Sequence, residues 1–205
     1  MFDQIIGNDV SCHPPCKNVV QSHAGNSADA AKNGAAFSNH IMRAGKHYAL
    51  FKRAGSVDVF GGQLFLGVIR PIDFERKGFD EFRPWDAKLN PVLAKEKCDG
   101  WGRGNVDYCA YHQSGTGMFG DWNNVLPEEE ELIREWPGKD VFPPVSFDDE
   151  ENSIGLLLDL DKGTLSVYKN GRRLGVMKEG LTGDYCWFVM VRAAGVQMER
   201  AAFPL

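Results

Sequence analysis

Apolar and polar residues alternate over short stretches in the last quarter of the chain. Leu156, Leu158 and Leu160 recur at a period of two, and Leu165 and Val167 repeat this spacing one stretch later. A period of two places these side chains on one face of a β-strand. An apolar face of this kind needs a second sheet to cover it, so the pattern predicts layered β-structure.

Turn signals separate these stretches. Asp161-Lys162-Gly163 supplies a glycine that can take a positive φ, and Asn170-Gly171 favours a type I′ hairpin turn because both residues tolerate positive φ. These turns lie too close together in the sequence for a helix to fit between them. This part of the chain therefore predicts consecutive antiparallel hairpins.

Similar short apolar stretches, punctuated by glycine, recur along the chain. We expect a first edge strand at 18–23, ordered chain over 35–41, and then strands at 47–51, 63–69, 106–112, 154–159, 164–169, 172–177, 186–191 and 196–201. The predicted fold class is all-β, an antiparallel β-sandwich with long loops and one short helix. Residues 1–17 show little periodicity and are expected to form a loosely ordered lead-in to a single sandwich domain over 18–205.

Two connections are too long to be simple hairpins, and we expect both to carry function, because long loops in compact domains usually do. The first spans 72–99, and the second spans 113–152. The first carries four aromatic residues: Phe74, Phe79, Phe82 and Trp85.

The predicted helix lies in the second connection. Pro127 suits a first helical turn, Glu128 to Glu131 favour the positive end of the helix dipole, and Glu130 can pair with Arg134. Pro137-Gly138 is expected to end this helix.

Composition and charge limit the partners. The 205 residues are 43% hydrophobic, enough for one domain with a substantial core, and the formal net charge is −5 with a pI near 5.5. A nucleic-acid partner requires a clustered positive field, so none is expected. The opening MFDQIIGNDV resembles neither a secretory signal nor a membrane span, so no membrane partner is expected.

The five cysteines, at positions 12, 16, 98, 109 and 186, leave one unpaired in any full disulfide scheme. An odd number suits a reducing compartment, so we read them as free thiols of a soluble, intracellular protein that is cytoplasmic or nuclear. Cys12-His13-x-x-Cys16 has residue types that zinc prefers, but no second pair of matching spacing follows. No zinc site is predicted.

No catalytic residues, metal or cofactor are predicted elsewhere. The five histidines occur without a nucleophile signature of the hydrolase families. Asp159-x-Asp161 lacks the closing glutamate of a calcium loop, and we interpret it, with the Asp148 to Glu151 run, as turn carboxylates.

Several motifs together resemble one family. DLDKGTLSVYKNGRRLGVM over 159–177, followed by GLTGDYCW over 180–187, resembles the C-terminal half of a SPRY domain. AGKHY at 44–48, GVIRP at 67–71 and GWG at 100–102 resemble earlier motifs of the same family, in the same order. The resemblance covers roughly 18–205 and implies a concanavalin A-like jelly-roll sandwich. Ala49-Leu50 departs from the Trp-Glu of many members.

The resemblance implies recognition without chemistry. SPRY modules typically bind proteins or peptides, often as substrate-recognition parts of ubiquitin ligases or as scaffold subunits. This chain carries no RING-type cysteine and histidine array. A ligase role would therefore require a subunit supplied by another chain.

Candidate partner-binding residues lie at strand ends that lead into the long loops: Arg70, Asp73, Tyr111, Gln113 and Trp136. Arg70 can bind a carboxylate or stack on an aromatic ring, and Tyr111 can act as an apolar anchor with a hydroxyl group. Alanine at Arg70 or Tyr111 is expected to weaken partner binding by about 1–2 kcal/mol with folding intact.

Two alternatives remain. A lectin-like sandwich that binds carbohydrate would require calcium ligands or an aromatic cluster on a concave face. A structural domain inside a larger assembly would require a broad apolar surface patch.

Overall fold

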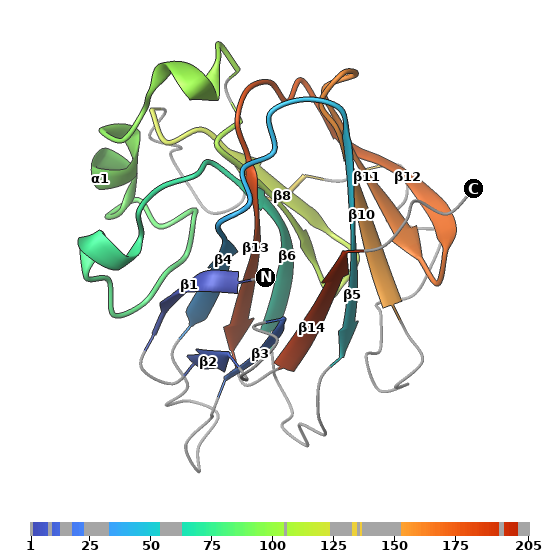
Figure 1. Ribbon diagram of the computed structural model, residues 1–205, viewed down its shortest axis with the longest axis horizontal. Coiled ribbons are helices and arrows are strands. Elements are labelled where there is room, and N and C mark those ends of the chain that lie inside the picture. The colour runs from blue at the N-terminus through green and yellow to red at the C-terminus, as the bar shows by residue number, and fades with distance from the viewer. Residues whose placement is uncertain are drawn as a thin grey trace.

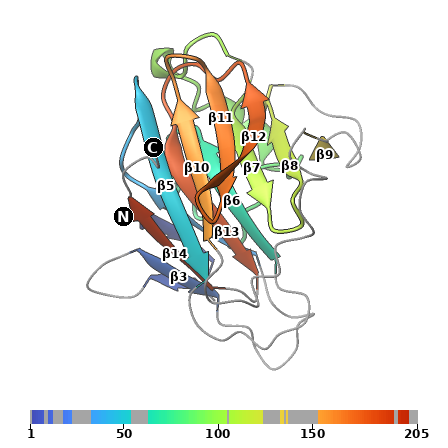
Figure 2. The same cartoon turned by 90° about the vertical axis from the view of Figure 1, so that its right-hand side faces the viewer.

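Two antiparallel sheets of seven strands each face one another in the computed structural model of the chain (Figures 1 and 2). The structure describes residues 2–7, 10–12, 18–22, 33–53, 63–104, 106–123, 133–134, 136, 153–192 and 195–200. The predicted all-β sandwich is therefore confirmed. No helix among these residues is long and apolar enough to cross a membrane.

The first sheet, sheet A, has the strand order β1-β4-β13-β6-β7-β8-β9. Its strands are β1 (Phe2–Ile6), β4 (Gly34–Ser38), β6 (Gln63–Ile69), β7 (Tyr108–His112), β8 (Gly117–Gly120), β9 (Ile133–Arg134) and β13 (Cys186–Arg192).

The second sheet, sheet B, has the order β12-β11-β10-β5-β14-β3-β2. Its strands are β2 (Val10–Cys12), β3 (Val19–Ser22), β5 (Lys46–Arg53), β10 (Ser153–Asp159), β11 (Thr164–Lys169), β12 (Arg172–Glu179) and β14 (Gly195–Arg200).

Sheet A is apolar on both faces. In β6, Leu64, Leu66 and Val68 belong to the core between the two sheets, whereas Phe65 and Ile69 belong to a second core on the other side. Strand β13 alternates in the same way. Because successive side chains of a strand point to opposite faces, a strand buried on both sides reads as a continuous apolar run.

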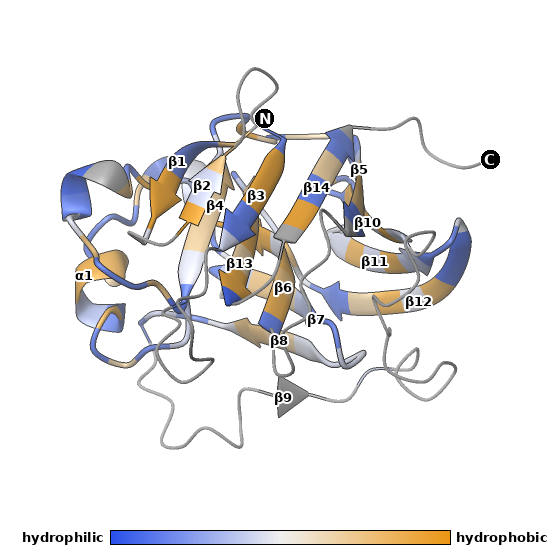
Figure 3. Ribbon diagram, turned by 90° about the horizontal axis from the view of Figure 1, so that it is seen from below, coloured by the Kyte–Doolittle hydropathy of each residue, from blue (hydrophilic) through white to orange (hydrophobic). Residues whose placement is uncertain are grey.

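The connection after β6 covers the outer face of sheet A as a third layer. It contains the 3₁₀ helix η2 (Glu75–Lys77), the α-helix α1 (Asn90–Ala94) and the 3₁₀ helix η3 (Asp99–Trp101). Phe74 stacks on Phe37 of β4 with ring centroids 3.8 Å apart, and Phe82 and Leu93 are fully buried. Figure 3 shows the apolar strands β6 and β13 between α1 and sheet B. We expected this connection to bind a partner. Its apolar side chains instead cover the outer face of sheet A.

The nine predicted strands are all present, with ends that shift by a few residues, and the ordered chain predicted over 35–41 overlaps strand β4. The predicted turns have the expected backbone: φ is 49° at Asn170, 78° at Gly171 and 67° at Gly163. Leu158 pairs with Leu165 across the β10–β11 hairpin, so the two period-two patterns face the same core.

The expectation of a loosely ordered lead-in over 1–17 is wrong for its described residues. Strand β1 pairs with β4 at the edge of sheet A, and β2 pairs with β3 at the edge of sheet B. Phe2 is fully buried in the core between the sheets. Strands this short show too little periodicity to be detected, and tertiary pairing supplies their hydrogen bonds.

The predicted helix falls largely outside the described residues, which resume at Ile133 and Arg134. These two residues form β9, paired with Met118 and Gly117 of β8. The helix prediction is therefore wrong at this point, because pairing with a sheet edge overrides a weak local propensity. The described α-helix is α1 in the first connection, where Pro91 occupies its first turn.

The burial of β1 predicts the effect of truncating its first residue. Phe2→Ala is expected to lower the free energy of unfolding by about 3 kcal/mol, because it removes a fully buried ring. Phe79→Ala is the same change at a half-buried ring of the third layer, and it is expected to lower the free energy of unfolding by a smaller amount. Urea denaturation measures both, and an unchanged stability for Phe2→Ala would restore the lead-in interpretation.

Candidate interaction surface

Five segments meet at one end of the sandwich, at the top of Figure 1, and we call this region the loop end. The loop end comprises residues 39–45, 70–72, 99–104 with 106–107, 160–163 and 180–185. These segments connect strands of both sheets and the third layer. They therefore bring together side chains that are distant in sequence.

Backbone hydrogen bonds join the segments of the loop end. Met42 and Tyr185 exchange two bonds of 2.7 and 3.1 Å, Leu160 donates to Gly45 at 2.9 Å, and Asp184 donates to Gly100 at 2.7 Å. The loop end is therefore a preformed surface held by its own backbone.

Arg70 lies at the centre of the loop end, directly after β6, and is 0% exposed. Its Nε donates to Oδ1 of Asp107 at 3.3 Å, and its Nη1 donates to the carbonyl oxygens of Thr182 at 2.7 Å and Asp184 at 3.1 Å. One guanidinium thus fixes the residue before β7 and the segment before β13.

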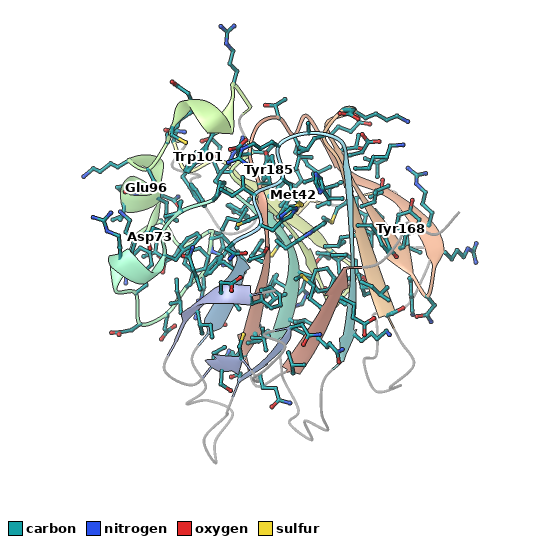
Figure 4. All side chains as sticks on the ribbon, in the orientation of Figure 1. Met42, Asp73, Glu96, Trp101, Tyr168 and Tyr185 are labelled. Atoms are coloured by element: carbon teal, nitrogen blue, oxygen red, sulfur yellow. The ribbon has the colours of Figure 1, made fainter. Side chains whose placement is uncertain are left out.

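Two aromatic rings flank this guanidinium. Its Cζ lies 4.1 Å from the ring centroid of Tyr185 and 5.8 Å from that of Trp101. The Tyr185 hydroxyl donates to the Val106 carbonyl at 2.6 Å. Figure 4 shows Trp101, Tyr185 and Met42 gathered at this end of the molecule. A cation against an aromatic face is attracted more strongly when both are removed from water, as they are here.

Asp107 is the counter-ion of Arg70. Its second carboxylate oxygen accepts a hydrogen bond from the backbone N–H of Trp122 at 3.0 Å. Burial raises the pKa of the Asp107 carboxyl, while the Trp122 hydrogen bond and the charge of Arg70 oppose that rise. The carboxylate therefore depends on Arg70 to remain charged in the core.

Two donors of this cluster have no hydrogen-bond partner among the described residues: Nη2 of Arg70 and Nε1 of Trp101. Both side chains are almost completely buried. Buried polar atoms are nearly always hydrogen-bonded in folded proteins, and among the described residues Asn90 Oδ1 and His112 Nε2 are further exceptions outside the loop end.

The rim of the loop end is polar. Arg43, whose side chain is 67% exposed, pairs with Asp184 at 3.4 Å. Arg103, Lys162 and Thr182 are exposed as well. These residues were not among the sequence candidates, although Arg103 lies between two glycines and Thr182 precedes Gly183, a composition typical of exposed turns.

Three of the sequence candidates are core residues. Arg70 is enclosed by the loop end, and Tyr111 and Trp136 are buried against each other with ring centroids 6.3 Å apart. Trp136 Nε1 donates to the Gly115 carbonyl at 2.7 Å, and burial raises the pKa of Tyr111 to about 12. Their prediction as surface anchors is corrected, because their side chains fill the sandwich interior and offer a partner no area.

The other two candidates lie apart. Asp73 is exposed on the third layer, where its carboxylate accepts from the backbone N–H of Arg76 at 3.3 Å (Figure 4). Gln113 is half-buried after β7, at the end of the strand opposite the loop end, and its backbone N–H donates to Leu64. The five candidates therefore form no common surface.

The carboxylates considered as calcium ligands have structural roles in the described part of the chain. Asp159 Oδ1 accepts from the Lys162 N–H at 3.1 Å and Asp161 Oδ1 from the Gly45 N–H at 3.0 Å, as expected of turn carboxylates. The described residues contain no group of three or more histidine, cysteine or acidic side chains placed to hold a metal. His13, Cys16 and the 148–151 run lie outside the described residues.

The four described cysteines are free: Cys12, Cys98, Cys109 and Cys186. Burial raises the pKa of both Cys109 and Cys186 to about 12. These two thiols remain protonated at neutral pH and act as small apolar side chains.

Solved structures share this architecture. The SPRY domain of human HERC1 is similar with a TM-score of 0.54 and 13% identity, covering 96% of this chain and 98% of that domain. A second human SPRY domain gives a TM-score of 0.55 and 14% identity over 98% of this chain and 99% of its own. The NHR1 domain of Drosophila melanogaster Neuralized is similar with a TM-score of 0.54 and 10% sequence identity, covering 98% of this chain and 97% of that domain. Neither a family model nor a curated protein matches the chain.

At these identities the comparisons establish the fold. The chain forms a SPRY-like β-sandwich domain, as the motifs at 44–48, 67–71, 100–102 and 159–187 predict. The 67–71 motif supplies Arg70, the 100–102 motif supplies Trp101, and the 180–187 segment supplies Tyr185. The residues that carry the resemblance therefore build the centre of the loop end.

The buried ion pair predicts a large cost for removing its cation. Arg70→Met is expected to lower the free energy of unfolding by about 3–5 kcal/mol, because Asp107 loses its buried counter-ion and must either stay charged in the core or take up a proton. Arg70→Met with Asp107→Asn is expected to recover part of that loss, since asparagine still accepts from Trp122. Arg43→Met, the same change at an exposed pair, is expected to cost less than about 1 kcal/mol.

Urea denaturation of the four proteins measures these differences. An Arg70→Met variant as stable as Arg43→Met would show that the pair contributes nothing to the fold.

His112, which precedes the β7–β8 turn, predicts a pH dependence of stability. Its Nδ1 lies 2.6 Å from the Ser114 hydroxyl, and burial lowers its pKa because the charged imidazole loses hydration. The unfolded chain therefore binds this proton at higher pH than the folded protein does. Stability is expected to fall as pH drops from about 7 to about 5, through the ordinary histidine range.

His112→Gln removes this titration, so the variant is expected to lose less stability than the wild type over the same interval. Urea denaturation at both pH values measures the difference. Parallel losses in the two proteins would exclude a contribution from His112.

Proposed function

We propose that this protein is a non-catalytic interaction module that binds a partner protein or peptide at the loop end, as a substrate-recognition or scaffold subunit. The observation that carries the proposal is the preformed loop end, in which five segments are joined over Arg70 and expose a polar rim. Loops held by a rigid scaffold commonly carry binding function, and a preformed surface loses little entropy on binding.

The groups with shifted pKa values support recognition over chemistry. Burial raises the pKa of Tyr108, Cys109, Tyr185 and Cys186, all of them core side chains. A catalytic group must contact a substrate, and perturbed residues at active sites lie in clefts for that reason. The exposed residues of the rim include Arg43, Arg103, Lys162 and Thr182 as well as Asp99 and Asp161, and they suit hydrogen bonding and charge pairing with a partner.

A role in ubiquitination belongs to this proposal only through another chain. The sandwich would then supply recognition, and a separate subunit would supply the ligase chemistry.

The alternatives receive less support. A lectin would require an exposed aromatic platform, but Trp101, Trp122, Trp136 and Trp187 are buried, and the half-buried Trp85 packs against the rings of Phe65 and Tyr108. A structural domain would require a broad apolar patch, yet among the described residues Val92 is the single large hydrophobic side chain that is exposed. A polar rim of this kind fits a reversible partner better than a permanent apolar interface.

Charge reversal at the rim tests the proposal. Arg103→Glu combined with Lys162→Glu changes two exposed residues of the loop end that neither sheet needs for its core. Arg172→Glu combined with Arg173→Glu makes the same change on exposed residues at the opposite end of β11 and β12, and serves as the matched control.

The expected result is that a partner captured by the wild type and by the control binds the loop-end variant at least about ten-fold more weakly. Quantitative affinity purification identifies the partner, and titration calorimetry with the purified partner measures the three dissociation constants. Equal affinity of the loop-end variant and the wild type would place the interaction on another surface.

A further inference from the structure

The outer face of sheet B carries apolar side chains that belong to neither core. Leu157 of β10 is 8% exposed and Tyr168 of β11 is 5% exposed, yet both lie outside the two core clusters. Their neighbours Leu156 and Val167 face the core between the sheets, so Leu157 and Tyr168 face the other way. The free face of an antiparallel sheet is normally polar, so this burial requires an explanation.

Strand β5 extends this apolar surface. Tyr48 pairs with Leu157 and Leu50 pairs with Gly155, so both β5 side chains lie on the same outer face. A Cβ built on Gly155 would stand 2.0 Å from the hydroxyl oxygen of Tyr48, so the Tyr48 ring lies across Gly155. The rings of Tyr48 and Tyr168 meet edge to face with centroids 5.8 Å apart. We call the surface formed by Tyr48, Leu50, Gly155, Leu157 and Tyr168 the outer strip.

Ion pairs bound the outer strip at both ends of β5. Lys46 pairs with Asp159 at 3.8 Å, and Lys52 pairs with Glu199 of β14 at 3.1 Å. Gln197 Nε2 also donates to the Glu199 carboxylate at 3.1 Å. An apolar centre with a polar border is the usual anatomy of a contact surface, so the outer strip has the form of one.

The described elements do not cover the outer strip. The described helices pack on the outer face of sheet A, and sheet A packs on the inner face of sheet B (Figure 1). Neighbours within one sheet cover the sides of a side chain and leave its outer end open. Burial also raises the pKa of Tyr48, and the nearby Tyr168 adds to that rise. The low exposure of the outer strip therefore requires a covering segment outside the described residues.

The segment 201–205, which follows β14, has the composition and the position to be that cover. Its sequence is AAFPL, which includes two large apolar side chains and no charge. Strand β14 ends at Arg200, which pairs with Ala49, the neighbour of Tyr48 in β5. Five extended residues span up to about 17 Å. Strand β11 lies two strands from β5, roughly 10 Å away, so the segment reaches the whole outer strip.

Pro204 favours a path across the sheet over a longer β14. Proline lacks the N–H that an inner strand needs for pairing, so β14 cannot continue through it. Proline also restricts the residue before it, Phe203, to extended backbone. An extended segment that leaves the sheet at this point can lay its side chains on the outer strip.

We infer that the segment 201–205 docks across the outer strip, with the Phe203 ring packed against Leu157 and Tyr48. This contact lies on another surface than the loop end and does not depend on the proposed function. It closes the apolar face of sheet B within the chain itself, and it leaves the polar loop end as the surface open to a partner.

Nuclear Overhauser effects (NOEs) in the full chain test the contact directly. With ¹³C-labelled methyl groups, NOEs are expected between the Phe203 ring protons and the Leu157 methyl groups. Phe203→Leu removes the ring and is expected to abolish these signals, which also assigns them. Phe147 is a second phenylalanine outside the described residues, and Phe147→Leu is expected to leave the NOEs to Leu157 intact.

A double-mutant cycle tests whether the contact stabilises the fold. Phe203→Ala is expected to raise the equilibrium constant of unfolding at least about ten-fold, because a buried ring returns to water. In a Leu157→Ala background the same change is expected to have a smaller effect, since the two side chains share one contact. Leu89→Ala, the same truncation in the third layer, is the control background, where the full effect is expected. Leu50→Ala replaces Leu157→Ala if that variant does not fold.

Three results would overturn the inference. The first is the absence of NOEs from Phe203 to the outer strip, and the second is an equal effect of Phe203→Ala in the Leu157→Ala and Leu89→Ala backgrounds. The third is an NOE that appears only between differently labelled chains in a mixed sample, which would assign the cover to a second copy. None of these results bears on partner binding by the loop-end variant, so the proposed function stands or fails separately.

Discussion

Sheet A has two apolar faces, and the rest of the molecule is arranged to cover both. Strands β6 and β13 alternate their side chains between the inter-sheet core and the outer core. Sheet B covers one face, as in any sandwich. No third sheet exists in the described part of the chain, so the 70–101 connection covers the other face with Phe74, Phe82 and Leu93. Hydrophobic burial thus explains a connection whose length alone would indicate a binding loop.

Arg70 lies where these layers end, and its position has an energetic consequence. A buried guanidinium is costly unless its hydrogen bonds and charge are matched. Asp107, the carbonyls before β13 and the Tyr185 ring supply most of that match. Asp107 lies on the segment before β7, and the other groups lie on the segment before β13. The same side chain that completes the end of the core therefore also determines the relative positions of the loops that form its surface.

The match is incomplete at Nη2 and at Trp101 Nε1, and this incompleteness has a cost in stability. Unsatisfied buried donors lower the stability of the folded protein. Local strain or unmet hydrogen bonding at functional sites is a general way in which proteins trade stability for binding.

The sequence determined the elements whose signals are local. Period-two patterns at Leu156 and Leu165 and the Asn170-Gly171 turn depend on neighbouring residues, so the β10–β12 hairpins and the sandwich class could be predicted. The tertiary structure decided everything that depends on long-range pairing: β1 and β9 are too short to show a period, and only strand pairing makes them strands.

The residues of the candidate site also divide into those that the sequence could indicate and those that depend on long-range contacts. Arg70 was a candidate because of its place at a strand end and its chemistry, but burial is a property of the folded chain, and it turned the expected surface anchor into the centre of the loop end. Tyr111 and Trp136 became core residues for the same reason. Thr182 and Gly104 are 78 positions apart in sequence, and no local pattern reveals that they meet. The sequence by itself determined which strands and turns form, because those signals act between neighbours; only the tertiary structure decided which side chains face a partner, because that depends on what the other layers cover.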